Sequence, residues 1–283
     1  MEFIKGRGNL ACTVFFPMKC GNNCSFCNTK KLYDNFELEP IYLARIYDYI
    51  RIANESDVIH EFVLTGGEPL FNLRMLKDLV KRMEKPVYIN TSLPNIPQID
   101  ETIEYINSEE KIWGVNISRH IGTGYNVKVC GKDRIDAIKK HKRINCLIKP
   151  EYIFDEDKLF KFIEDYGDDY TMINFRADYR LVTPDTLKNR DLVHEWMMKN
   201  FRYEYSSNCL VCNSEFFSDN KGRVICYHRG LENSMVETPN YTYVNDVLID
   251  MYGRIHPTWD FSPEENWDFV MWLKTYKEHY IED

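Results

Sequence analysis

The stretch "FPMKCGNNCSFCN" (residues 16–28) places Cys20, Cys24 and Cys27 within eight positions, directly after an apolar run. Three thiolates on one loop can hold three irons of a 4Fe–4S cubane and leave the fourth iron without a protein ligand. The glycine and asparagines at 21–23 permit the positive backbone angles that a loop needs to wrap around such a cluster. A zinc site or a set of buried thiols is the alternative that this spacing leaves open.

A second motif, "LTGGEPL" (residues 64–70), stands at the end of the next predicted strand. Gly66 and Gly67 let a ligand approach the backbone closely, and Glu68 can accept hydrogen bonds from a ligand ammonium group. The same residues also suit an ordinary strand-to-helix turn. Their position one strand after the cysteine loop favours the functional interpretation.

With these two motifs the chain resembles the radical S-adenosylmethionine (SAM) superfamily over about residues 10–180. The resemblance rests on CxxxCxxC with an aromatic residue, Phe26, before the last cysteine, and on GGEP at the second strand. It implies that a 4Fe–4S cluster is bound by Cys20, Cys24 and Cys27, and that its open iron chelates the amino and carboxylate groups of SAM. It also implies that the methionine end of SAM is served by Gly66, Gly67, Glu68 and Pro69.

The resemblance implies radical chemistry. In that superfamily a reduced cluster passes one electron to the SAM sulfonium, and the resulting 5'-deoxyadenosyl radical removes hydrogen from an unactivated carbon. The cofactor carries the difficult step, while the protein supplies orientation and excludes solvent and oxidants. An electron donor such as flavodoxin or ferredoxin is implied as a partner.

Short apolar runs alternate with amphipathic segments up to about residue 200. The predicted strands are 11–16, 62–65, 87–90, 112–118, 144–148 and 171–175, and helical patterns follow at 40–53, 73–83, 99–106, 135–138, 159–166 and 185–199. Apolar strands that alternate with one-sided helices are typical of parallel sheets with crossovers. We therefore predict an α/β fold, a partial (βα)6 TIM-like barrel of radical SAM type, with its site at the carboxyl ends of the strands.

Polar residues occupy the ends of these strands. Strand alternation places Asn90 with Ser92 on one face of the third strand, and Asn116, Ser118 and His120 on one face of the fourth. By resemblance, Ser118 is a ribose contact, Arg119 helps to hold the cofactor carboxylate, and Asn116 belongs to the same cofactor-binding group. The sixth strand carries the candidate catalytic or substrate-binding residues Asn174, Arg176 and Asp178, with Arg180 beyond them. The alternative is that such residues cap helices or pair with each other, and single histidines (His120, His194, His228) are expected to be structural.

A second group of cysteines lies in "NCLVCNSEFFSDNKGRVICYH" (residues 208–228). Alternation around a turn at 220–222 predicts a hairpin that brings Cys226 back beside Cys209 and Cys212. The spacing resembles the abbreviated auxiliary-cluster domain, called twitch, of the GTP 3',8-cyclase family of molybdenum-cofactor biosynthesis. It implies a second 4Fe–4S cluster near the substrate. The alternative is a structural zinc ribbon completed by His228, Cys130 or Cys146.

Near residue 200 the alternation of apolar runs and amphipathic segments gives way to short strands and turn signals, which predicts two domains. Residues 1–200 would form the radical SAM partial barrel, and residues 201–283 a small α+β twitch-like domain that ends in a helix over 263–280. Cys12, Cys130 and Cys146 fall on or near predicted strands and are expected to be small core residues.

Composition limits the choice of partners. The formal net charge is −8, which gives no general attraction to nucleic acid or to an anionic membrane, so a small ligand in a pocket is expected. No stretch approaches the roughly 20 apolar residues of a membrane span. Nine cysteines, six of them in two groups, fit metal ligation in a reducing compartment, so a cytoplasmic location is predicted.

The sequence therefore predicts a radical SAM enzyme that acts on a small-molecule or nucleotide substrate, with cyclisation or rearrangement as the outcome. Modification of a peptide or protein side chain is one alternative, although only about ten residues precede the first strand, which argues against a built-in leader-binding module. Modification of a nucleic-acid base is disfavoured by the charge. A metal-binding module without turnover is the remaining alternative.

Overall fold

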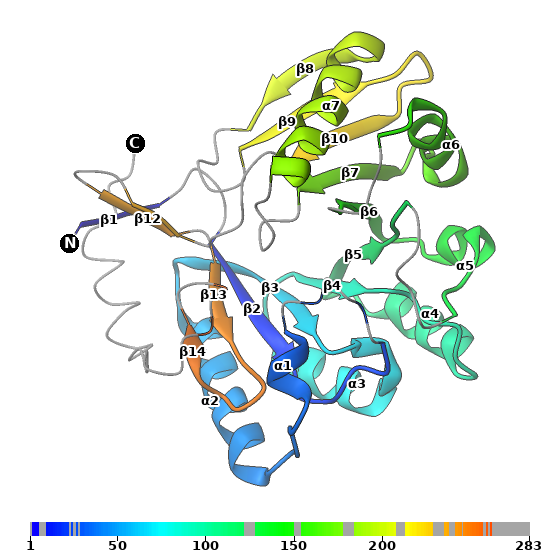
Figure 1. The fold of residues 1–283 in the computed structure, drawn as a ribbon. Helices are drawn as coiled ribbons and strands as arrows, with labels where there is room; N and C mark the ends of the chain where they lie inside the picture. The colour runs from blue at the N-terminus through cyan, green and yellow to red at the C-terminus, as the bar shows by residue number, and fades with distance from the viewer. Residues whose placement is uncertain are drawn as a thin grey trace.

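The computed structural model describes residues 2–5, 10–22, 24, 27, 29–121, 128–149, 154–177, 184–207, 213–228, 235–237, 241–244, 246–256, 259 and 261. A curved parallel sheet forms its centre, with helices α2 to α6 along the outer side of the curve (Figure 1). Within the described residues, no helix is long and apolar enough to cross a membrane.

All six predicted strands are confirmed, and they pair in parallel in chain order. They are β2 (Leu10–Phe16), β3 (Ile59–Gly66), β4 (Val87–Thr91), β5 (Ile112–Ser118), β6 (His141–Ile148) and β7 (Thr171–Ala177). This order agrees with the predicted partial barrel. The carboxyl ends of the strands meet at one edge, where α1 and the glycine motif also lie.

The predicted helices are confirmed as well. They are α2 (Pro40–Glu55), α3 (Leu73–Arg82), α4 (Ile99–Ser108), α5 (Lys132–Ala137), α6 (Glu156–Tyr166) and α7 (Pro184–Asn200), and two short additions are α1 (Lys30–Tyr33) and the 3-10 turn η1 (Pro69–Phe71). Proline at the first position starts α2, and the side chain of Asn72 caps α3 by accepting from the Met75 amide at 2.9 Å.

The two faces of the sheet differ in chemistry. On β6, Ile144, Cys146 and Ile148 are buried in the main hydrophobic core together with helix residues such as Ile135. Because side chains alternate along a strand, the residues between them point to the other, concave face. We call this the concave face; among the predicted site residues it carries Asn116, Ser118, Asn174 and Arg176.

The C-terminal strands add to both edges of the same sheet. Strand β10 (Val224–His228) pairs in parallel with β7 and continues into β9 (Ser214–Ser218) and β8 (Arg202–Ser206), while β13 (Asp246–Ile249) pairs in parallel with β2 and continues into β14 (Ile255–His256). A separate small sheet contains β1 (Glu2–Lys5), β11 (Met235–Glu237) and β12 (Tyr241–Val244). The sheet is thus continuous across the predicted boundary at residue 200. The predicted helix over 263–280 lies outside the described residues.

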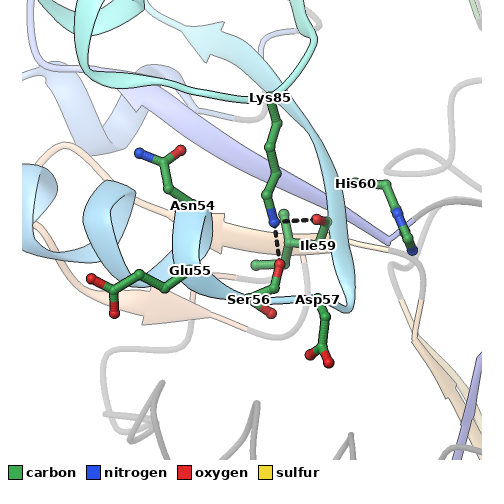
Figure 2. A pocket seen from close by; sticks show the side chains of 7 residues that line it. All are labelled: Asn54, Glu55, Ser56, Asp57, Ile59, His60 and Lys85. Atoms are coloured by element: carbon green, nitrogen blue, oxygen red, sulfur yellow. Dashed lines mark hydrogen bonds between the residues drawn. The ribbon is translucent and has the colours of Figure 1, made fainter.

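A pocket opens at the amino end of β3 (Figure 2). The glycine motif lies at the other end of the same strand. Its lining consists of Asn54, Glu55, Ser56, Asp57, Ile59, His60 and Lys85. The Lys85 ammonium donates to the carbonyls of Ser56 and Ile59, so it ties the segment after α2 to the start of β3. In a barrel of this kind the amino ends of the strands serve stability rather than chemistry, and we assign Lys85 that role.

Candidate active site

The first cysteine loop connects the end of β2 at Phe16 to the start of α1 at Lys30. Cys20, Cys24 and Cys27 are half-buried there with free thiols. The Cys27 amide donates to the Cys24 carbonyl at 3.1 Å, and the Asn22 amide donates to the Cys20 sulfur at 3.4 Å. Phe26, the aromatic residue of the motif, lies outside the described residues.

The thiols of this loop suit soft-metal ligation. Burial raises the pKa of Cys20 to about 12 and also raises the pKa of Cys24, and each thiol of the loop adds to the effect on Cys20. The three thiols are therefore close enough for their charges to interact. A bound metal is what allows neighbouring thiols to ionise together. Among the described side chains, no three of His, Cys, Asp or Glu already converge as a metal site. The donor set fits a 4Fe–4S cluster, and the ligand assignment stays a prediction.

The glycine pair packs directly against this loop. Gly66 has a φ of +91°, and a Cβ there would lie 2.3 Å from the Tyr33 hydroxyl. A Cβ on Gly67 would lie 2.2 Å from the carbonyl oxygen of Met18 in the cysteine loop. No side chain fits in either place, so the end of β3 and the loop touch backbone to backbone. The two motifs of the sequence are therefore parts of one site.

Glu68 is 2% exposed and accepts four hydrogen bonds. They come from the Leu70 amide (3.2 Å), the Thr91 hydroxyl (2.6 Å), and the amide (2.8 Å) and hydroxyl (2.6 Å) of Ser92. Burial raises the pKa of Glu68, and these bonds oppose the rise. Since the Asn22 side chain also donates to the Ser92 hydroxyl at 3.1 Å, the carboxylate joins β3, β4 and the cysteine loop. Its predicted contact with a ligand ammonium stays a prediction, as does that of the buried Pro69 beside it.

Arg119, after β5, is 2% exposed, and its guanidinium donates hydrogen bonds to three backbone carbonyl groups. Its Nη1 donates to Ser92 O at 2.6 Å and Ser118 O at 2.7 Å, and its Nη2 donates to Cys130 O at 2.9 Å. The guanidinium thus ties together the ends of β4 and β5, a role that the sequence did not indicate. The predicted contacts of Ser118 and Arg119 with the cofactor stay predictions.

Two hydrogen-bonded groups of amide side chains, which we together call the amide row, lie on the concave face. The Asn90 amide donates to the Thr65 hydroxyl at 3.1 Å, and the Asn116 amide donates to Asn90 Oδ1 at 2.8 Å. On the other side the Asn174 amide donates to Asn145 Oδ1 at 2.9 Å. The alternation of the strands predicted Asn90, Asn116 and Asn174. It missed Thr65 and Asn145, although Asn145 stands inside a predicted strand with a side chain too polar for the helix-facing side.

Two arginines flank this row on β6 and β7. Arg143 is in register with Asn116 and Met172, and Arg176 is in register with His228. Burial raises the pKa of Glu61 on β3, and the positive charge of Arg143 opposes that rise, so the two side chains are close enough to interact electrostatically. Sequence reasoning singled out Arg176 and missed Arg143. Asp178 and Arg180, the other candidates on this strand, lie outside the described residues.

Cys226 faces the same side. It pairs with Asn174 across β10 and β7, is 3% exposed, and has a pKa raised by burial to about 11. Phe175, beside Asn174, is in register with Cys146, so Cys146 points to the opposite face and cannot share a metal ion with Cys226. The zinc alternative that included Cys146 is therefore wrong.

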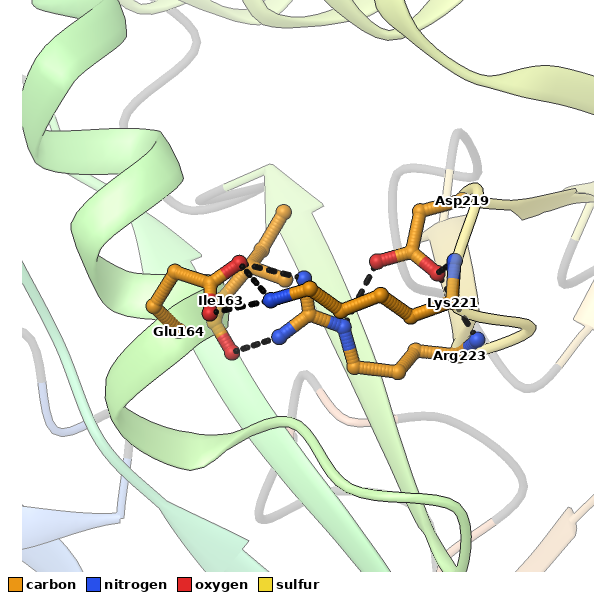
Figure 3. A network of polar contacts seen from close by, with 5 residues as sticks. All are labelled: Ile163, Glu164, Asp219, Lys221 and Arg223. Carbon is orange, nitrogen blue, oxygen red and sulfur yellow. Dashed lines mark hydrogen bonds and ion pairs between the residues drawn. The ribbon is translucent and has the colours of Figure 1, made fainter.

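The predicted hairpin is confirmed as β9 and β10, with Gly222 at a φ of +80° in the turn. Figure 3 shows how the turn is anchored to α6. Arg223 pairs with Asp219 through Nε (2.6 Å) and with Glu164 through Nη2 (2.6 Å), and Lys221 pairs with Glu164 at 2.9 Å. These ion pairs fix the strand that carries Cys226. Cys209 and Cys212 lie outside the described residues.

The three histidines singled out from the sequence, and three further cysteines, make structural contacts. His120 accepts from the Leu147 amide at 3.0 Å, and its pKa is lowered to about 3 by burial. His194 contacts Glu215 at 2.5 Å, and His228 contacts the Ser214 hydroxyl at 3.1 Å. The expectation that three further cysteines are core residues is confirmed, since all are buried: Cys12, Cys130 and Cys146.

Comparison with known proteins bears on the family and the fold of this chain. The family model described as "Radical SAM superfamily" matches residues 14–205. Among solved structures, SuiB of Streptococcus suis bound to the precursor peptide SuiA matches with a TM-score of 0.57 and 15% identity, over 95% of this chain and 64% of that chain. SuiB bound to S-adenosylmethionine matches with a TM-score of 0.53 and 15% identity, over 88% of this chain and 60% of that one. No curated protein sequence matches.

The chain belongs to the radical SAM superfamily. Membership in this superfamily implies an enzyme that binds a 4Fe–4S cluster and SAM. The structural matches establish a shared fold, and the chain spans less than two thirds of the length of the SuiB chains.

Proposed function

We propose that this enzyme cleaves SAM reductively and uses the 5'-deoxyadenosyl radical to remove hydrogen from a small-molecule or nucleotide substrate, with cyclisation or rearrangement as the outcome. The observation that carries the proposal is the backbone contact between the cysteine loop and Gly67, where a Cβ would lie 2.2 Å from Met18 O. A loop of three thiols and the glycine pair are thereby joined at the carboxyl ends of the strands.

The residues of the loop would hold the cluster through Cys20, Cys24 and Cys27. When bound, the cluster supplies the electron that opens the SAM sulfonium. Gly66 and Gly67, whose missing side chains let the loop pack against the end of β3, would lie beside the methionine end of SAM, and Ser118 and Arg119 would contact the cofactor from the end of β5. The amide row and Arg176 on the concave face would orient the substrate, and Arg143 adds a positive charge in its middle. An anionic group on the substrate would suit that wall.

A second 4Fe–4S cluster, held by Cys209, Cys212 and Cys226 as in the twitch domain of GTP 3',8-cyclase, is part of the proposal. Its support is the position of Cys226, which shares the concave face with Asn174 and so adjoins the substrate region. Flavodoxin or ferredoxin is the proposed electron donor.

A peptide is the second candidate substrate. It is favoured by the match to SuiB, whose structure holds the precursor peptide SuiA, over 95% of this chain. Radical cleavage of SAM is common to both candidates, so the site residues named above keep their roles in either case.

The test is iron and sulfide analysis with electron paramagnetic resonance on protein reconstituted without oxygen, beside a Cys209, Cys212, Cys226 triple alanine variant. Two cubanes predict about eight irons per chain and about four in the variant. Formation of 5'-deoxyadenosine from SAM and dithionite is measured on the same samples, first alone and then with nucleotides or candidate peptides. A wild-type protein that binds iron but forms no 5'-deoxyadenosine contradicts the proposal. About four irons in both proteins contradicts the second cluster alone.

A further inference from the structure

The hydroxyl of Tyr33 bridges the two motifs of the site. It donates to the carbonyl of Phe16, where β2 enters the cysteine loop, at 2.9 Å. It also accepts from the amide of Gly67, in the glycine motif, at 2.8 Å. Tyr33 itself stands at the end of α1, directly after the loop, and is 6% exposed. One side chain therefore contacts both the entry of the loop and the strand end beside it.

This contact fixes the direction of a peptide group at the site. The peptide between Gly66 and Gly67 is planar and trans, so its carbonyl points opposite to its N–H. Because the Gly67 N–H points at the Tyr33 hydroxyl, the Gly66 carbonyl is directed away from it. Gly66 has no side chain to restrict the rotation of this peptide, and it adopts a φ of +91°, which residues with a side chain rarely do. The tyrosine supplies the restriction that the glycine lacks.

Tyr33 is in turn held by the C-terminal strand pair. It forms a small hydrophobic cluster with Phe36 and Met251, and Met251 is fully buried in the turn between β13 and β14. The Tyr33 and Phe36 rings lie 6.0 Å apart, and the Phe36 and Tyr252 rings 5.2 Å apart, both edge to face. The Tyr252 hydroxyl donates to the Leu32 carbonyl in α1 at 3.3 Å. A segment more than 200 positions away thus buttresses the tyrosine.

The turn between β13 and β14 packs closely against α2. Gly253 has a φ of +67°, and a Cβ there would lie 2.5 Å from the Cβ of Arg45 in α2. Asp250 is fully buried and pairs with Arg254 at 2.7 Å and with His256 at 3.0 Å. The turn is therefore rigid in itself and pressed onto α2, which makes it a fixed support.

We propose that Tyr33 is a positioning residue that sets the Gly66–Gly67 peptide relative to the cysteine loop, and that the β13–β14 turn holds Tyr33 in place. This inference rests on the proposed function, since it assigns the oriented peptide to the methionine end of SAM. It makes the C-terminal strands part of the SAM site even though none of their described residues belongs to either motif.

The test compares Tyr33→Phe with Tyr252→Phe in the reconstituted holoenzyme. Both remove one hydroxyl from the same cluster, but only the first loses the bonds to Phe16 and Gly67. We expect Tyr33→Phe to keep the wild-type iron content and to bind SAM about tenfold more weakly by equilibrium dialysis. The change that SAM causes in the paramagnetic resonance spectrum should weaken in parallel. Hydrogen exchange should rise in peptides that contain Gly67. Tyr252→Phe keeps both hydrogen bonds of Tyr33 and loses only the bond to Leu32, so it should change all three measurements less than Tyr33→Phe does.

A third variant keeps the tyrosine and loosens its support. Met251→Ala opens space beside Tyr33, so we expect a smaller loss of SAM affinity in the same direction. Wild-type SAM affinity, spectrum and exchange in Tyr33→Phe would overturn the inference, and so would equal losses in Tyr33→Phe and Tyr252→Phe. If the wild-type enzyme neither binds nor cleaves SAM, the proposed function itself fails, which is a distinct result read from the wild type alone.

Discussion

The carboxyl groups of Glu68 and Asp246 and those of the hairpin that carries Cys226 are in opposite electrostatic states. Glu68 lies beside the first cysteine loop, and Asp246 lies at the opposite, amino end of β2, in register with Ala11. Neither has an ion pair within the described part of the chain, and burial raises the pKa of both carboxyl groups, that of Asp246 to about 8. At the hairpin that carries Cys226, the pKa of Glu164 is lowered to about 2 by hydrogen bonds from Arg223 and Lys221. For Asp219, burial is outweighed by the bonds from Arg223, and its pKa is also lowered.

The difference teaches that the two regions are supported by different forces. The first is held by hydrogen bonds among buried neutral donors, backbone contacts and Tyr33, and the second by ion pairs at one end of a hairpin. The sign of the pH response follows from this. A raised carboxyl pKa means stability that is present at low pH and lost as pH rises through the folded value. A lowered pKa means stability that is lost as pH falls.

The largest expected effect separates the two regions by their chemistry. Cys24→Ala removes a proposed cluster ligand from the first loop, and SAM cleavage should fall by more than about 100-fold, beyond the loss typical of a residue that only supports a ligand. Cys226→Ala should reduce the iron content by about half and lower SAM cleavage far less. The measurement is 5'-deoxyadenosine formed with dithionite, and Cys12→Ala in the core is the control. Equal losses in Cys24→Ala and Cys226→Ala would contradict this division.

The next effect concerns Asp246, on the strand that pairs with β2. Its folded pKa of about 8 lies above its ordinary value of 3.8, so ionisation destabilises the fold as pH rises between these values. Asp246→Asn removes that charge. Relative to wild type, the variant should therefore gain about 3 kcal/mol more in unfolding free energy at pH 8 than at pH 5. Urea denaturation at both pH values measures this, with the exposed Asp48→Asn as control; a gain that does not depend on pH would contradict it.

Glu68 tests whether hydrogen bonds alone hold the first region. Glu68→Gln keeps the shape of the side chain but replaces one acceptor oxygen with an NH2 donor. This donor would face either the amide and hydroxyl of Ser92 or the Leu70 amide and the Thr91 hydroxyl, all of which are donors themselves. We expect a loss of about 2 kcal/mol in unfolding free energy, from a buried donor left without an acceptor. Thermal or urea unfolding checks this against Glu84→Gln on the surface. A variant as stable as that control would show that the four bonds are not needed.

The strands and helices of the barrel could be predicted because periodicity is a local signal. Strand β6 was predicted from 144 and begins at His141, because His141 to Arg143 are too polar to read as a buried strand. Their pairing with β5 and β7 is a property of the sheet and not of the segment. The same limit hid the addition of β10 and β13 to the two edges. Their partners in β7 and β2 lie far away in the sequence.

The parts of the site that consist of residues close together in the sequence could be predicted, and the parts that depend on tertiary contacts could not. The cysteine spacing and GGEP identified both motifs. The contact of Tyr33 with Gly67 spans 34 positions, and that of Glu68 with Ser92 spans 24. The sequence pattern indicated Gly67, Glu68 and Ser92 individually, but it could not indicate which residues they contact. Arg143 could have been found by extending the alternation of its strand by one residue.

The smallest effect distinguishes the two cations of the hairpin turn. The Arg223 side chain is 8% exposed and Asp219 6%, whereas Lys221 is 58% exposed. Breaking a buried pair leaves a carboxylate without its cation, so Arg223→Met should cost about 2 kcal/mol, less than for a fully buried pair because Glu164 is half-exposed. Lys221→Met should cost less than about 0.5 kcal/mol. Urea denaturation gives both values, and hydrogen exchange in peptides from 214–228 should rise only in Arg223→Met. Equal and small losses would mean that the sheet pairing of β10 with β7, and not the ion pairs, places Cys226.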